Sequence, residues 1–138
     1  MLIPKKVKHR KWQKGRSRMR KTETRGLQVS YGQFGIKAMG SAWLNSRQIE
    51  AGRKTISNYL KRKGRVWIRV FPDKPVTKRP PETTMGGGKG SVEYYVFPVR
   101  PGRVIFEVDG VPRDDAREAL RRAGFKLPFK TKVVERHE

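Results

Sequence analysis

Short alternating blocks of apolar and polar residues begin at Leu27 and predict a series of strands. The blocks LQVSYG and FGIKAMG are interrupted by glycines, and they predict two strands joined through Gly32 or Gly35. Further strands are predicted at residues 65–72, 91–99, 103–108 and 126–134. The second and third of these flank Pro101 and Gly102, so we expect them to pair as a hairpin.

One helix is predicted to begin at Asn45, because Gln48 in the third position completes a capping box. Gly64 is placed to end this helix in a left-handed turn. Its apolar stripe consists of Ile49, Ile56, Tyr59 and Leu60, and its opposite side carries Arg53, Lys54, Lys61, Arg62 and Lys63. The last three also suit the negative end of the helix dipole, so a structural role for them stays open.

A second helix is predicted from about Pro112, with Asp114 and Asp115 at its positive end and Gly124 at its stop. Its buried stripe is expected to contain Ala116, Ala119, Leu120 and Ala123. Small residues of this kind let a helix lie close to a sheet. Together these elements predict an α+β fold, in which a mostly antiparallel sheet is covered by two helices.

Two segments fall outside this pattern. Residues 1–25 have no periodicity and little to bury, and they predict a basic arm that is disordered until it meets its partner. Residues 72–91 hold four of the nine prolines and four of the fourteen glycines, which predicts a long flexible loop. Residues 26–138 are therefore expected to form a single domain that carries this loop.

The charge of the chain is large and unevenly distributed. The 138 residues contain 34 Lys plus Arg and 12 Asp plus Glu, a formal net charge of +22. Residues 1–25 contain 11 basic residues and one acidic residue, residues 26–72 contain nine and one, and residues 92–138 contain ten and eight. A polyanion whose counterions are released on binding would neutralise this charge, so nucleic acid is the expected partner. A solvated charge run is the alternative, but a modest net charge is enough for solubility.

Candidate catalytic and metal-binding groups are scarce. The chain has no cysteine, and its two histidines, His9 and His137, lie near the chain ends without metal-ligand spacing to carboxylates. Glu93 and Glu107 could face each other on the expected hairpin, but nearby arginines at positions 100 and 103 offer simple pairing. We therefore predict that the protein is not an enzyme, and that it takes no cofactor, no metal and no small-molecule substrate.

The sequence predicts neither a membrane protein nor an exported one. No apolar run approaches the ~20 residues that a spanning helix needs. The N-terminal segment MLIPKKVKHRKW lacks the apolar stretch of a secretory signal. We therefore expect a soluble protein without a membrane partner.

Residues 85–90, MGGGKG, have the composition of a phosphate-binding loop but not the pattern of a nucleotide-binding one. Thr83 stands at the first glycine position of the Walker pattern, and Gly90 follows Lys89 where Ser or Thr is required. A strand rather than a helix is predicted next. The segment is therefore either a flexible finger that presses its bare backbone and Lys89 against RNA, or a mobile connector.

Several motifs, in their order and spacing, resemble the bacterial-type large-subunit ribosomal protein family L-sixteen. They are MLIPKKVKHRK, YGQFGIKAM, SRQIEAGRK, RVWIRVFPDKP, MGGGKGSVEYYV, PGRVIFEVDGVP, AREAL and KLPFKTKVV. The resemblance covers residues 1 to about 134, and RVWIRVFPDKP and GKGSVEYY are its most specific pieces. It implies an α/β hammerhead-type domain that contacts large-subunit rRNA near the base of the central protuberance. It also implies late entry into the subunit, neighbouring large-subunit proteins as partners, and contact with A-site and P-site tRNA.

The resemblance also assigns candidate binding residues by position. The arm would thread among rRNA helices, and we expect the rRNA-binding residues to be Lys5, Lys6, Lys8, Arg10, Lys11, Lys14, Arg16, Arg18, Arg20, Lys21, Arg25, Arg53, Lys54 and Arg69. The loop that reaches tRNA would be Met85, Gly86, Gly87, Gly88, Lys89 and Gly90. Many family members carry Arg where this chain has Thr84, and Lys is common where it has Gly87. Contacts by those two side chains are therefore not expected to carry over.

The leading hypothesis is thus a structural rRNA-binding protein that helps to position tRNA. The alternatives are a free RNA chaperone or nucleoid protein and an RNA-modifying enzyme, and the latter lacks an acid/base, thiol or nucleotide motif. We expect the protein in the ribosomes of a bacterial cytoplasm, with a plastid or other organelle also open.

Overall fold

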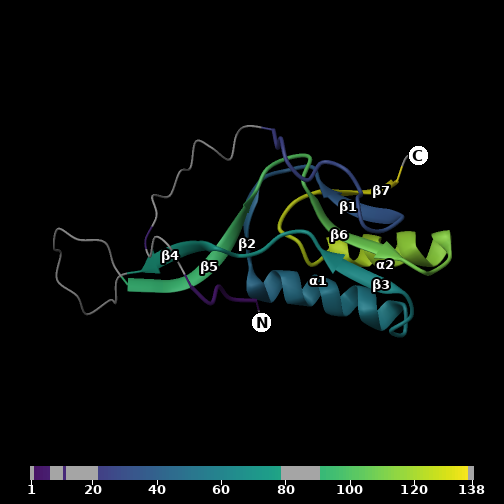
Figure 1. The fold of residues 1–138 in the computed structure, drawn as a ribbon, viewed down its shortest axis with the longest axis horizontal. Helices are drawn as coiled ribbons and strands as arrows, with labels where there is room; N and C mark the ends of the chain where they lie inside the picture. Colours follow the sequence, from purple (N-terminus) through teal and green to yellow (C-terminus); the bar gives the residue numbers. More distant parts are fainter. Residues whose placement is uncertain (1, 7–10, 12–21, 79–90, 137–138) are drawn as a thin grey trace.

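The computed structural model describes residues 2–6, 11, 22–78 and 91–136 of the chain (Figure 1). Its elements are β1 (Phe34–Ala38), β2 (Ala42–Asn45), α1 (Ser46–Tyr59), β3 (Arg65–Ile68), β4 (Lys74–Lys78), β5 (Ser91–Val99), β6 (Val104–Asp109), α2 (Arg113–Gly124) and β7 (Thr131–Glu135). The strands form a four-stranded sheet in the order β3-β6-β1-β7 and a three-stranded sheet in the order β2-β5-β4. All strand pairs are antiparallel, which confirms the α+β class.

The two helices form where their caps and stripes predict them. Asn45 Oδ1 accepts a hydrogen bond from Gln48 N at 2.9 Å, and Gln48 Oε1 accepts one from Asn45 N at 3.1 Å, so the capping box is complete. The predicted apolar residues of α1 and α2 are buried except Tyr59, which is half-buried. Figure 1 shows both helices side by side on one face of the four-stranded sheet.

The other face of this sheet is covered by residues 22–32, which we call the covering segment. Val104 N donates a hydrogen bond to Gly26 O at 2.8 Å. The side chain of Val29 packs against Gly35 of β1, where a Cβ atom on Gly35 would lie only 2.9 Å from Cγ2 of Val29. Residues 104–108 of β6 are therefore all buried, since both faces of this central strand are covered. The prediction of a strand at residues 27–32 is wrong, because the segment crosses the sheet instead of joining it.

The expected hairpin of residues 91–99 and 103–108 is also wrong. β5 lies between β2 and β4, and β6 lies between β3 and β1, so neither strand has a free edge for the other. The chain passes from one sheet to the other through Pro101 and Gly102, and Gly102 N donates to Ala38 O at 2.7 Å. Glu93 and Glu107 consequently lie in different sheets.

Three element boundaries differ from the predicted ones. The predicted loop 72–91 contains β4, whose Pro75 is tolerated because β4 is an edge strand with one side free of ladder bonds. The strand predicted at residues 65–72 ends at Ile68, although Arg69 N still donates to Ile105 O at 2.9 Å. The last strand covers residues 131–135 rather than 126–134.

The first helix ends at Tyr59, five residues before the glycine that was expected to stop it. Gly64 does adopt a positive φ of 76°, but it does so in the connection to β3. Lys61 and Arg62 adopt positive φ values of 51° and 62° before it. Side chains with a Cβ rarely adopt this conformation, so the turn is strained at two consecutive basic residues.

Candidate nucleic-acid interface

Basic side chains on the α2 side of the molecule are paired with carboxylates. Glu118 accepts hydrogen bonds from Arg121 and Arg122, and Glu135 accepts them from Arg113 and Arg117. The hydrogen bond from Arg121 holds the pKa of Glu118 below its ordinary value, with a further contribution from Arg122. With Asp114 and Asp115 in the first turn of α2, four acidic residues balance these four arginines, so this surface carries little net charge that could attract a polyanion.

The α1 side is different. Arg53 pairs with Glu50, and that hydrogen bond lowers the pKa of the Glu50 carboxyl. Within the described parts of the chain, Lys54, Arg62 and Lys63 form no ion pair with a carboxylate. All three side chains are exposed. Most of the positive charge at the end of α1 is thus uncompensated within the described structure.

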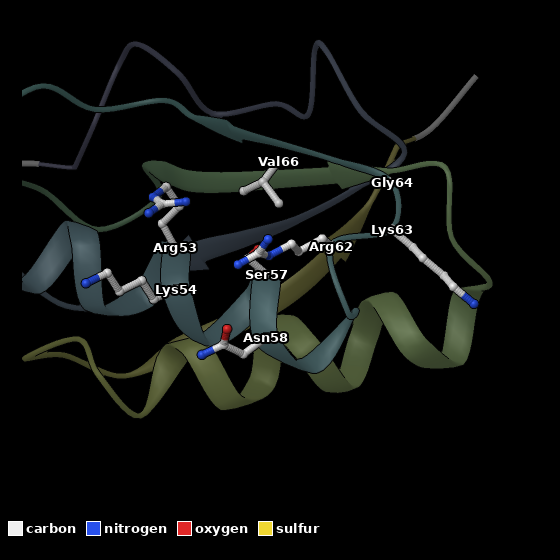
Figure 2. A pocket seen from close by; sticks show the side chains of 8 residues that line it. All are labelled: Arg53, Lys54, Ser57, Asn58, Arg62, Lys63, Gly64 and Val66. Carbon is white, nitrogen blue, oxygen red and sulfur yellow. The ribbon is translucent and has the colours of Figure 1, made fainter.

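The strained turn at the end of α1 determines where these cations lie. Arg62 N donates to Ser57 O at 2.9 Å, and Lys63 N donates to Leu60 O at 3.0 Å, so the chain folds back on the last turn of the helix. Gly64 then lies against Asp109, where a Cβ would collide with the backbone carbonyl oxygen. Figure 2 shows the Arg62 side chain lying beside Ser57 as a result, whereas Lys63 points away along the edge of the site.

An open pocket of about 600 Å³ lies between α1 and the start of β3. We call it the α1 pocket, and its lining residues are Arg53, Lys54, Ser57, Asn58, Arg62, Lys63, Gly64 and Val66 (Figure 2). Four of the eight are cationic, two carry hydroxyl or amide donors, and none is acidic. Phosphate oxygens accept hydrogen bonds from all of these groups, and a guanidinium can bind two phosphate oxygens at once. The α1 pocket therefore has the chemistry of a site for a phosphodiester backbone.

The structure brings together only some of the predicted rRNA-binding residues. Arg53 and Lys54 both line the α1 pocket. Of the arm, Lys5, Lys6, Lys11 and Arg25 are described, and all are exposed. The other arm residues, namely Lys8, Arg10, Lys14, Arg16, Arg18, Arg20 and Lys21, and the predicted tRNA-contacting residues Met85, Gly86, Gly87, Gly88, Lys89 and Gly90 lie outside the described residues.

Arg69 lies elsewhere, beneath the covering segment. Its guanidinium donates to the carboxylate of Glu107 and, at 3.3 Å, to Gln28 O. Glu107 is completely buried, and its Oε1 also accepts hydrogen bonds from the backbone amides of residues 30, 31 and 32 at 2.9, 2.7 and 2.9 Å. The partner of Glu107 is thus Arg69 and not Arg100 or Arg103. Arg69 therefore has a structural role, and its contact with rRNA stays a prediction.

Arg103 joins this network at the junction of the two sheets. Its Nη2 donates to Arg69 O at 2.8 Å, and its guanidinium carbon lies 5.1 Å from the ring centroid of Phe97 on β5. Burial lowers the pKa of Arg103, and the charge of Glu23 opposes this shift. Within the described chain, Nε of Arg103 is buried without a hydrogen-bond acceptor. Arg103 therefore links the chain after β3 to Phe97 of β5 at this junction.

Sequence reasoning missed two features of the α1 pocket. Arg62 and Lys63 were considered as possible partners of the helix dipole, but they lie beyond the helix end. Ser57 and Asn58 carried no motif, and only the folded turn brings them to the cations. The density of basic residues between positions 53 and 63 was the one signal available.

A comparison with protein families decides what kind of protein this is. A family model described as Ribosomal protein L16p/L10e matches residues 4–134. The chain belongs to this family. Membership makes it a large-subunit ribosomal protein with a structural role in translation, and its partners are rRNA and other ribosomal proteins. Its location is accordingly the ribosome, in the cytoplasm or in an organelle.

The two helices fall short of the length and apolar character that crossing a membrane would require. Residues 2–6, 11, 22–78 and 91–136 also contain no cluster of three or more His, Cys, Asp or Glu side chains suited to a metal ion.

Proposed function

We propose that this L16p/L10e member anchors itself to large-subunit rRNA near the base of the central protuberance through the arm of residues 1–25 and the α1 pocket. The observation that carries this proposal is the contrast between two helices of similar size. The four arginines of α2 are paired with carboxylates, whereas three of the four cations that line the α1 pocket, Lys54, Arg62 and Lys63, form no ion pair with a described carboxylate. Because phosphate contacts dominate the affinity of proteins for RNA, the α1 side is the side that faces rRNA.

The same proposal includes contact with A-site and P-site tRNA by residues 85–90, in support of tRNA positioning and late subunit assembly. The support is the pairing of β4 with β5, in which Lys78 and Ser91 are partners across the ladder. This pairing places Lys78 and Ser91, which flank residues 79–90, side by side in the three-stranded sheet. In the proposed contact Lys89 supplies the charge that meets tRNA. The protein performs no chemistry of its own in this function.

The deciding experiment is sedimentation of a lysate in a sucrose gradient at moderate salt. A large-subunit anchor travels with the large subunit, and deletion of residues 1–25 shifts it toward the top of the gradient. A free RNA chaperone or nucleoid protein would stay at the top in both forms, and that result would overturn the proposal.

The tRNA contact has its own test. Lys89→Ala is expected to weaken tRNA retention by purified subunits while leaving incorporation of the protein unchanged. Loss of incorporation with normal tRNA retention would contradict this part of the proposal. Turnover of rRNA fragments by the purified chain would contradict the absence of catalysis.

A further inference from the structure

The covering segment presents one aromatic ring to solvent. Tyr31 is 60% exposed, although it lies directly above the four-stranded sheet. The face below it is the one opposite the helices, because Val66 and Ile68 of β3 pack into the helix-covered core and Trp67 points the other way. An aromatic ring usually buries most of its area, so an exposed ring that is held in place needs an explanation.

Tyr31 is held through both its backbone and its ring. Tyr31 N donates to Oε1 of Glu107 at 2.7 Å. The ring stacks on Trp67 with a centroid separation of 6.4 Å and an interplanar angle of 21°. The guanidinium carbon of Arg69 lies 4.9 Å from the Tyr31 ring centroid.

The two supports of the ring come from one side. Trp67 and Arg69 are two positions apart along one extended stretch of chain, so their side chains share a face. Both therefore reach Tyr31 from the sheet, and Tyr31 remains 60% exposed beside them. Arg69 is held in turn by its ion pair with Glu107, which is completely buried. The position of the exposed Tyr31 ring therefore depends on this ion pair.

We propose that Tyr31 is a stacking site for an unpaired nucleobase of RNA. A ring whose orientation is already fixed loses little conformational entropy when a base stacks on it. Proteins commonly hold unpaired bases by stacking them on aromatic side chains. The cation–π contact of Arg69 with the Tyr31 ring helps to hold that ring in its orientation. This inference rests on the proposed function in one respect, namely that the partner is RNA.

Phe125 provides a matched comparison within the same chain. Its ring is 72% exposed and has Arg121 at 5.4 Å from its centroid. No stacking partner for it and no buried carboxylate at its backbone occur among the described residues. A ring that is exposed but not stacked from below should contribute little to base binding.

The test measures the affinity of the full chain for two labelled probes by fluorescence anisotropy. One probe is a single-stranded oligoadenylate, and the other is an RNA duplex with the same number of phosphates. Tyr31→Ala is expected to weaken binding to oligoadenylate about tenfold and to leave duplex binding and the salt dependence unchanged, since no charge is removed. Tyr31→Phe should bind both probes as the unmodified chain does, and so should Phe125→Ala.

Tyr31→Leu separates stacking from simple apolar contact. Leucine retains an apolar side chain without a π face, so it should lose affinity for oligoadenylate as alanine does. Normal binding by Tyr31→Leu or Tyr31→Ala would overturn the stacking site, and so would equal losses for the two probes. Urea unfolding of each variant confirms that the fold is intact. If the unmodified chain binds neither probe, the proposed function itself fails. If it binds both and Tyr31→Ala changes nothing, only the stacking site fails.

Discussion

Glu107 on β6 and Arg69, which directly follows β3, form an ion pair beneath the covering segment, and Glu107 is completely buried there. The same carboxylate accepts three backbone amide hydrogen bonds from residues 30–32, so one side chain ties the covering segment to the sheet. Burying a charge is costly unless its partners satisfy it, and removal of one partner leaves the other charge uncompensated. The stability of this layer therefore depends on both residues together.

Glu107→Gln is expected to lower the free energy of unfolding by about 3 kcal/mol, because the partly buried guanidinium of Arg69 would lose its counter-charge. Urea unfolding measures the change. The double variant Glu107→Gln with Arg69→Gln should lose less than the two single variants added together, with a coupling energy of about 0.5–3 kcal/mol. Additive losses would contradict the pairing.

The α1 pocket predicts a specific change in the salt dependence of RNA binding. Lys54→Gln, Arg62→Gln and Lys63→Gln together remove three uncompensated cations. If each neutralises one phosphate, the slope of log affinity against log salt should flatten by about two to three units. Binding of an rRNA fragment at several salt concentrations measures the slope.

The matched control for this triple variant removes the same charge elsewhere. Lys126→Gln, Lys130→Gln and Lys132→Gln change exposed lysines that line no part of the α1 pocket. The control should leave most of the slope intact. Equal flattening by both triple variants would mean that RNA responds to net charge alone and not to the α1 pocket.

The left-handed conformation of Arg62 at the end of α1 predicts that replacing this residue can raise stability while weakening RNA binding. Arg62 has a φ of 62°, which glycine adopts without steric cost. Arg62→Gly should therefore raise the free energy of unfolding by up to about 1 kcal/mol, since relief of the strain exceeds the added entropy of the unfolded chain. The same variant should weaken RNA binding, because it removes a cation of the α1 pocket.

Lys61→Gly is the control for the turn variant. Lys61 has a φ of 51° but does not line the α1 pocket. It should give a similar gain in stability with a smaller loss of RNA affinity. If Arg62→Gly binds RNA as the unmodified chain does, the strained turn has no binding role.

The helices of this fold could be predicted from the sequence because their signals are local. The capping box spans four residues, and the buried stripes of α1 and α2 repeat every three or four positions. Each helix therefore forms where its own residues specify it. The end of α1 is the exception, because the close approach of Gly64 to Asp109 is a contact between distant parts of the chain.

The strand pairings could not be predicted because each strand can pair with several others, and the local sequence does not specify which. The segments of β5 and β6 look like a hairpin, yet each is placed between two other strands, and no local pattern indicates those neighbours. β4 was hidden by Pro75, a residue that is tolerated in this strand because β4 lies at the edge of its sheet. Glu107 resembled an ordinary surface acid in the sequence, and its role depends on amides 75 to 77 residues away.

The pairing of Glu135 with α2 predicts how stability depends on pH. The hydrogen bond from Arg113, followed by the one from Arg117, lowers the pKa of Glu135 below its ordinary value of 4.5. A carboxyl whose pKa is lower in the folded state stabilises the fold above the unfolded pKa, and that contribution is lost as the pH falls through the folded pKa. Glu135→Gln should therefore be less stable at neutral pH and should show a shallower loss of stability as the pH falls below about 4.5.

Glu93→Gln is the control for this pH dependence, since Glu93 is exposed and forms no ion pair with any residue that the structure describes. Thermal unfolding at a series of pH values, at low ionic strength, compares the two variants. Added salt should reduce the difference at neutral pH, because the Glu135 pairs are partly exposed and ions screen them. A pH profile of Glu135→Gln that is parallel to that of the unmodified chain would show that β7 is held to α2 by packing alone.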